Sequence, residues 1–192
     1  VCGDMPVGKI TYPPPVKLIA GLLSAHPEKL DVALAALAQD FGPTDLQSEP
    51  TAFDHTDYYA AEMGENLKRQ YVSFAKLIGR ESLPAVKLLT KELEAKMTDP
   101  VTGGRPVNVD PGYVALEQMV LATTKGYGHR VYLKDGIYGE LTYRYRNKSY
   151  RPLDWTYPDY REEGAINFFN AVRRRYVEQI RHLRELDGTP AL

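Results

Sequence analysis

The chain has 192 residues, a net charge of −1 and a single cysteine, Cys2. This length suits one domain that buries a core without disulfides, and one cysteine excludes a disulfide framework and a cysteine-based zinc site. No apolar run approaches the roughly 18 residues needed to cross a bilayer, and residues 1–15 lack the pattern of a signal peptide. We therefore expect a soluble cytoplasmic protein with an N-terminal arm at residues 1–15 and one domain at residues 16–188.

The first part of the chain predicts alternating strands and helices. Residues 16–23 are almost entirely apolar, which is typical of a buried strand. Residues 27–42 predict a helix that starts at a proline and closes at a glycine. Residues 46–53 predict a weaker strand at a sheet edge, because Pro50 cannot donate to a ladder. Residues 69–78 predict the next strand.

A second helix is expected to begin near Pro84, with Ser82 as its N-cap. Residues 106–113 then predict a strand, which Pro111 and Gly112 are expected to end in a turn. This strand–helix–strand order, given twice, is that of a split βαβ sheet, so we expect an α+β, ferredoxin-like fold. The buried stripe of the second helix is expected to comprise Val86, Leu89, Leu93 and Met97.

The rest of the chain predicts an added hairpin and a long helix. Residues 116–124 fit either a helix or a strand. Residues 130–133 and 137–145 predict a tyrosine-rich β-hairpin across a turn in which Gly136 supplies a positive φ. A C-terminal amphipathic helix follows, ended by Gly188 and Pro190. Its expected apolar stripe comprises Ile166, Phe169, Val172, Tyr176, Ile180 and Leu183.

The motif FDHTDYY, which starts at Phe53, places two carboxylates and an imidazole on a predicted loop. Asp54 and Asp57 are suited to share a divalent cation, and His55 is a candidate general base. Alternatively, Thr56 or Asp57 caps a short helix. The residues alone leave both interpretations open.

The motif VNVDPGY at residues 107–113 places Asn108 and Asp110 on the same face of a predicted strand. A strand end with these two polar side chains predicts a ligand or metal site. The alternative is turn chemistry, in which Asp110 bonds the backbone that follows it.

Residues 123–130 hold three donors that suit a phosphate group, Lys125, His129 and Arg130, around two glycines. The segment is not a P-loop, since no G-x-x-x-x-G-K-[ST] pattern occurs in the chain. The alternative is an ordinary solvent-exposed loop. Basic side chains outnumber acidic ones from Lys125 onward, which favours an anionic ligand in this part of the chain.

Most of the 14 tyrosines lie between Tyr113 and Tyr160, and tyrosine alternates with arginine at residues 143–146. Such an aromatic and basic surface is typical of proteins that stack single-stranded nucleic acid. Alternatively, the rings cover a core and keep their hydroxyls hydrated. The aromatic segment that begins at Trp155 is predicted either to cover a pocket or to connect to the last helix.

Eight motifs spread over the chain carry a family resemblance. They are PVKL at 15–18, FDHTDYY at 53–59, EMG at 62–64, VNVDPGY at 107–113, ATTK at 122–125, HRVYL at 129–133, GIY at 136–138 and WTYPDY at 155–160. With these motifs the chain resembles the domain of unknown function 4416 family. The resemblance implies an aromatic residue where this chain has His55, which favours Asp54 and Asp57 over His55 as catalytic residues. Some relatives carry a GTP-binding label, but no guanine-reading [NT]-K-x-D motif occurs here.

These patterns together predict a protein that binds a phosphorylated small molecule or nucleotide, with metal-assisted hydrolysis or transfer as its reaction. The alternative is a single-stranded RNA-binding module that uses the tyrosine–arginine hairpin. The expected cofactor is a divalent cation such as Mg²⁺ or Mn²⁺, held by Asp54, Asp57 and Asp110. The expected phosphate ligands are Lys125, His129 and Arg130, and the expected catalytic residues are Asp54, Asp57 and Glu140. The expected pocket residues are Tyr58, Asn108, Tyr113, Tyr138, Trp155 and Asp159.

Overall fold

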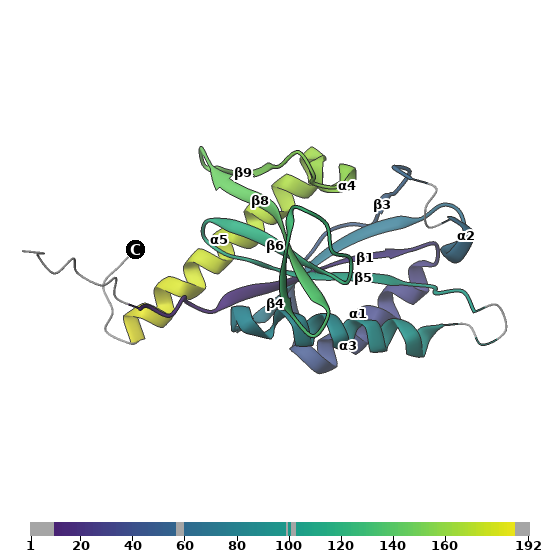
Figure 1. Ribbon diagram of the computed structural model, residues 1–192, viewed down its shortest axis with the longest axis horizontal. Helices are drawn as coiled ribbons and strands as arrows, with labels where there is room; N and C mark the ends of the chain where they lie inside the picture. Colours follow the sequence, from purple (N-terminus) through teal and green to yellow (C-terminus); the bar gives the residue numbers. More distant parts are fainter. Residues whose placement is uncertain (1–9, 57–59, 99, 101–102, 187–192) are drawn as a thin grey trace, which may run out of the picture.

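The computed structural model describes residues 10–56, 60–98, 100 and 103–186, and these form an α+β domain (Figure 1). Within these ranges nine strands make one sheet in the order β2-β4-β1-β5-β6-β8-β7, with β3 paired to β4 and β9 paired to β8. The strands are β1 (Val16–Ser24), β2 (Thr44–Gln47), β3 (Thr51–Ala52), β4 (Lys68–Ile78), β5 (Asn108–Val114), β6 (Gln118–Thr123), β7 (Arg130–Lys134), β8 (Ile137–Arg146) and β9 (Ser149–Pro152). Every pairing is antiparallel.

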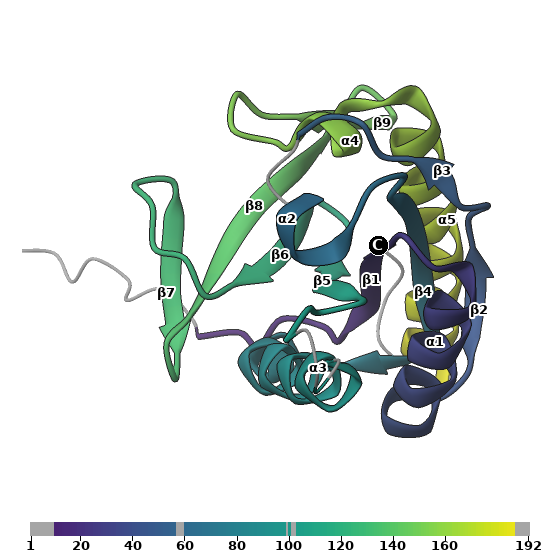
Figure 2. The same cartoon turned by 90° about the vertical axis from the view of Figure 1, so that its right-hand side faces the viewer.

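The helices occupy both faces of this sheet. They are α1 (Pro27–Phe41), α2 (Ala60–Met63), α3 (Leu83–Met97), α4 (Pro158–Arg161) and α5 (Glu163–Leu186). Figure 1 shows α1 and α3 side by side beneath the sheet, and Figure 2 shows how strongly the sheet curls between α3 and α5. In the described ranges no helix combines the length and the apolar character required to span a bilayer.

The first half of the chain runs β1–α1–β2–β4–α3–β5, with the four strands in the order β2-β4-β1-β5. The strands and helices that the sequence predicts here are confirmed. The predicted edge strand at residues 46–53 is divided at Pro50 into β2 and β3, and both pieces pair with β4. Proline has no N–H to donate, so the ladder breaks there.

The alternation of side chains along β1 separates two cores. Leu18, Ala20 and Leu22 pack against α1 and α3, whereas Ile19 packs in the cluster that contains α5. Because successive strand residues point to opposite faces, the central strand is buried on both sides. The sequence shows this as the uninterrupted apolar run at residues 16–23.

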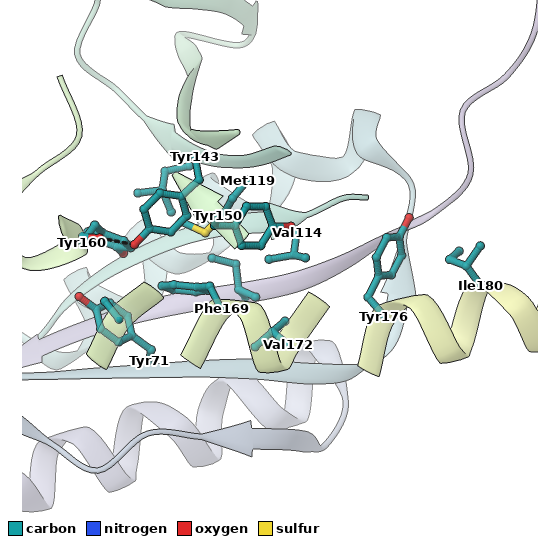
Figure 3. Packing of buried hydrophobic residues seen from close by; sticks show 13 residues of the cluster. Tyr71, Val114, Met119, Tyr143, Tyr150, Tyr160, Phe169, Val172, Tyr176 and Ile180 are labelled. Carbon is teal, nitrogen blue, oxygen red and sulfur yellow. Dashed lines mark hydrogen bonds between the residues drawn. The ribbon is translucent and has the colours of Figure 1, made fainter. Parts of the chain in front are cut away.

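The α5 core is built from tyrosines, as Figure 3 shows. Tyr143 and Tyr150 are fully buried on the hairpin strands, and Tyr176 of α5 is fully buried as well. The Tyr150 hydroxyl donates to the carbonyl of Ala115, and the Tyr143 hydroxyl donates to the carbonyl of Tyr160. The prediction of a tyrosine platform for nucleic acid is therefore wrong for Tyr143 and Tyr150, whose rings are covered by the last helix.

The buried face of α3 differs from the predicted stripe. Leu89 is 42% exposed, while Lys87, Thr90 and Glu94 are buried. Lys87 Nζ donates to the carbonyl of Val109 at 2.8 Å, and Glu94 Oε1 accepts from the Val109 N–H at 2.6 Å. Lys87 and Glu94 thus point toward the sheet, because they bond the Val109 backbone at the edge of β5 where β6 does not pair.

Pro111 and Gly112 do not end the predicted strand but lie inside β5. Residues 116–124, which fitted a helix or a strand, form strand β6. The two strands pair only from Gly112 to Val114, opposite residues 119–121. Gly112 is required there because a Cβ atom would overlap the Val120 carbonyl of β6.

The predicted hairpin is formed by β7 and β8, with Gly136 at φ +76° in the turn. Strand β7 is an edge of the sheet. The predicted C-terminal helix is α5, whose buried residues include Phe169, Val172, Tyr176 and Ile180. Leu183 is 39% exposed, so the stripe ends earlier than predicted. Gly188 and Pro190 lie outside the described residues.

Candidate functional site

A cavity of about 440 Å³ lies on the α5 side of the sheet, at the point where β5 and β6 separate. Asp110 of β5 and residues 122–123 of β6 line it where the two strands are unpaired, and Leu121, which pairs with Gly112, lines it as well. Pro111 stands next to the last paired residue of β5, and it has no N–H with which to extend the ladder toward β6. The remaining lining residues are Phe53, His55, Thr56, Arg69, Lys125, Tyr127, Arg130, Glu140, Tyr157, Pro158, Asp159 and Tyr160.

One wall of the cavity carries a buried arginine between two carboxylates. Arg69 of β4 is 4% exposed, and its Nε lies 2.9 Å from Asp159 Oδ2. Its NH1 group lies 3.4 Å from Asp110 Oδ2. Burial disfavours the charged form, but Asp159 and then Asp110 outweigh it and raise the pKa of Arg69 above its usual value. Arg69 therefore remains a cation under the rings of Phe53 and Tyr160.

Asp110 has two further partners, Asn108 of the same strand and Lys87 of α3. Asn108 Nδ2 donates to Asp110 Oδ2 at 2.8 Å, and Lys87 Nζ lies 3.7 Å from Asp110 Oδ1. The predicted same-face arrangement of Asn108 and Asp110 is thus confirmed. Both carboxylate oxygens of Asp110 already face nitrogen donors of the protein.

The opposite wall carries a second buried ion pair. Arg130 Nε donates to Glu140 Oε2 at 2.7 Å, and both side chains are 2% exposed. The other guanidinium nitrogens of Arg130 donate to the Lys125 carbonyl and to the Tyr157 hydroxyl, each at 2.9 Å. Burial works against the charge, but the hydrogen bond to Glu140 raises the pKa of Arg130. Arg130 therefore fixes the segment that presents Lys125 to the cavity.

Three buried polar atoms on the cavity walls have no hydrogen-bond partner among the described residues: Arg69 Nε, Glu140 Oε1 and the Tyr160 hydroxyl. Arg69 Nε still forms the ion pair with Asp159 described above. Burial raises the pKa of Tyr160 well above its usual value, so this hydroxyl keeps its proton and can donate. Gly21 of β1 makes room for it, because a Cβ atom at Gly21 would overlap the Tyr160 hydroxyl.

The rim of the cavity is formed by the segment that follows β3. Phe53 is buried there, and His55 Nε2 lies 2.8 Å from Glu162 Oε1, just before α5. This contact links residues 53–56 to the start of α5. His55 thus lies at the cavity.

The structure brings together a large part of the residue set that the sequence singled out. Asp110, Lys125, Arg130, Glu140 and Asp159 line the same cavity. Behind them, His129 Nε2 lies 3.2 Å from Glu140 Oε2, and its ring stacks between those of Tyr127 and Trp155.

Other predicted residues lie apart from this cavity. Asp54 is exposed and is not among the lining residues. Tyr113 points to the opposite face of β5 and packs beside Arg80, and Tyr138 packs against Gly126. Asp57 and Tyr58 lie outside the described residues. The predicted cation site of Asp54, Asp57 and Asp110 remains a prediction, and the described residues contain no cluster of three metal-binding side chains.

Sequence reasoning missed Arg69, Tyr157 and Tyr160 as cavity residues. Arg69 has no distinct local signal, because it stands between Lys68 and Gln70 in the polar start of its strand. No local signal distinguishes Tyr160 from the other tyrosines, since its role depends on Gly21, which is far away in the sequence.

The comparisons with known proteins identify a family but no activity. A family model described as Domain of unknown function (DUF4416) matches residues 14–176. The matched region contains all the cavity residues named above. No curated protein and no solved structure matches the chain. The chain belongs to the DUF4416 family.

Proposed function

We propose that this protein binds a phosphorylated small molecule or nucleotide in the cavity between β5 and β6. The observation that carries the proposal is a concave site of about 440 Å³ that Lys125 lines, on a segment whose backbone Arg130 holds. Pockets for small ligands have volumes of this order and combine apolar walls with a few convergent polar groups. Nucleotides and sugar phosphates both fall within this size range.

Lys125 is the side chain that the proposal places on the phosphate. The segment that carries it is held by Arg130, which bonds the Lys125 carbonyl and is itself paired with Glu140. A lysine ammonium suits a phosphate as a compact point charge with three donors. The rings of Phe53, Tyr127, Tyr157 and Tyr160 supply the apolar wall for the rest of the ligand.

The same proposal extends to the architecture. We assign the unit β1–α1–β2–β4–α3–β5 to a ferredoxin-like split βαβ sheet, supported by its strand order β2-β4-β1-β5 and its antiparallel pairings. Strands β6 to β9 and α5 are then additions to this unit. The cavity lies at the junction between the two parts.

The RNA-binding alternative has less support than the phosphate site. Its stacking surface requires exposed rings, and Tyr143 and Tyr150 are fully buried. Tyr145 is occupied by Arg173, whose guanidinium carbon lies 3.4 Å from the ring centroid. Tyr143 and Tyr150 therefore contribute to the core, while Tyr132 of β7 is 57% exposed.

Binding is tested by thermal melting and calorimetry of the full chain with matched compounds. Adenosine monophosphate is compared with adenosine, and glucose 6-phosphate with glucose. A ligand that binds only the folded state raises the melting temperature, so the phosphorylated member of at least one pair is expected to do so. Lys125→Ala is expected to weaken that binding by about tenfold, since a charged hydrogen bond contributes about 1.5 kcal/mol or more.

The matched control is Lys91→Ala, because Lys91 is an exposed lysine on α3, outside the cavity. It is expected to leave the affinity unchanged. The proposal is wrong if no phosphorylated compound raises the melting temperature. It is also wrong if Lys125→Ala and Lys91→Ala bind the ligand as tightly as the parent protein.

A further inference from the structure

The charges that line the cavity are balanced. Arg69, Lys125 and Arg130 are its cations, and Asp110, Glu140 and Asp159 are its anions. A site built only for a phosphate dianion would carry an excess of positive charge, because the low-dielectric wall strengthens every uncompensated charge. A wall with balanced charges instead suits a ligand that carries both a positive and a negative charge.

Most of these charged groups are already satisfied by the protein. Arg69 is held by Asp159 and Asp110, and Asp110 faces Lys87 and Asn108 as well. Their ion pairs give this wall its shape. A ligand gains little from groups whose partners it would have to displace.

Glu140 is different, because only one of its two oxygens is engaged. Its Oε2 accepts from Arg130 Nε at 2.7 Å and lies 3.2 Å from His129 Nε2. Its Oε1 is buried and has no hydrogen-bond partner among the described residues. Leaving a buried acceptor unpaired costs about 1–3 kcal/mol, and more when the group is charged. The site therefore favours a ligand that supplies a donor to this atom.

The Tyr160 hydroxyl offers the complementary group. It is buried on the same cavity and also lacks a partner among the described residues. A tyrosine hydroxyl that keeps its proton donates to an anionic oxygen. Glu140 and Tyr160 thus provide one acceptor and one donor that the described part of the chain leaves unused.

We infer that the ligand is a phosphorylated amine, whose N–H group donates to Glu140 Oε1 while Lys125 and the Tyr160 hydroxyl hold its phosphate. This inference rests on the proposed function, because it names the ligand class for the same cavity. A positively charged amine and a phosphate together match the balanced wall. Amine-free phosphates bind more weakly, because they leave Glu140 Oε1 unpaired.

The test uses matched phosphates that differ in the amino group. Glucosamine 6-phosphate is compared with glucose 6-phosphate, and phosphoethanolamine with ethyl phosphate, by calorimetry on the full chain. In at least one pair the amine is expected to bind about tenfold more tightly, the ratio that one additional charged hydrogen bond gives. Equal affinities within every pair would overturn the inference.

Two variants test the roles of Glu140 and Tyr160 separately. Glu140→Gln is expected to abolish the tenfold ratio within each pair, whatever it does to the phosphate affinity that both members share through Arg130 and Lys125. Tyr160→Phe is expected to weaken both members equally, because the hydroxyl contacts their common phosphate. If Glu140→Gln fails to fold, the comparison of matched ligands on the parent protein decides alone.

The two proposals fail in different ways. If none of these four compounds, nor any phosphate in the first panel, raises the melting temperature, phosphate binding itself is wrong. If phosphates bind and the amine adds nothing, phosphate binding stands and the assignment of Glu140 is wrong. A ratio that persists in Glu140→Gln would also contradict that assignment.

Discussion

Glu140 and Arg130 form an ion pair of 2.7 Å in which each side chain is 2% exposed. Removing one partner leaves the other buried and uncompensated, so Arg130→Ala is expected to cost about 3–5 kcal/mol of unfolding free energy. Urea denaturation measures this loss. The control Arg144→Ala removes an exposed arginine from the same hairpin and is expected to cost no more than about 0.5 kcal/mol. Equal losses in the two variants would show that the buried pair does not stabilise the fold.

Gly21 is the residue that admits the Tyr160 hydroxyl. Gly21→Ala is expected to destabilise the protein by about 1–3 kcal/mol, because the new methyl group overlaps that hydroxyl. Tyr160→Phe removes the hydroxyl and is expected to relieve part of the loss when combined with Gly21→Ala. A double-mutant cycle in urea measures the coupling between the two positions. Strictly additive effects would contradict the contact.

Glu94 links α3 to the open side of β5. Its carboxylate accepts from the Val109 N–H at 2.6 Å and from Arg105 NH1 at 2.8 Å. Glu94→Ala is expected to cost about 1–3 kcal/mol, because it leaves a buried N–H unpaired. Hydrogen exchange at the Val109 amide is expected to accelerate with it. Glu92→Ala, an exposed change on the same helix, is expected to leave that exchange rate unchanged.

Buried tyrosines make stability depend on alkaline pH. Burial raises the pKa of Tyr176 to about 12, and it also raises the pKa of Tyr71, Tyr143 and Tyr150. The unfolded chain loses these protons near pH 10 while the folded protein retains them, so the contribution of these tyrosines to the unfolding free energy is fully present below about pH 10 and falls above it. For Tyr176 the fall extends from about pH 10 to about pH 12.

Tyrosinate absorbance checks this prediction. In the folded protein the buried group is expected to titrate later than the exposed tyrosines, and urea is expected to merge the two phases. Tyr176→Phe is expected to reduce the loss of stability between about pH 10 and pH 12. A single folded-state phase near pH 10 would mean that these hydroxyls are accessible to solvent.

The sequence predicted the elements well where the local pattern matches the tertiary environment. The run at residues 16–23 and the Gly136 turn behave as their residue types indicate. The prediction failed at Pro111 and Leu89 for one shared reason. Both depend on the edge of β5, which α3 rather than a strand covers, and no local pattern encodes that arrangement.

Five of the predicted site residues meet in the cavity, on strands β5, β7 and β8, on the loop that follows β6 and on α4. The sequence could not give their partners. Glu140 and Arg130 are paired by the register of the β7–β8 hairpin, and Arg69 pairs with Asp159, which lies nearly half the chain away in the sequence. Such long-range pairings are properties of the fold.

The short ladder between β5 and β6 has a mechanical consequence. The strands from β2 to β5 and those from β6 to β7 are joined there over only three residue pairs, Gly112–Leu121, Tyr113–Val120 and Val114–Met119. The ladder therefore offers little resistance to a change of angle between the two parts of the sheet. The Tyr160 hydroxyl lies against Gly21 of β1 and Glu140 lies on β8, so the proposed ligand, bonded to both, would cross-link the two parts.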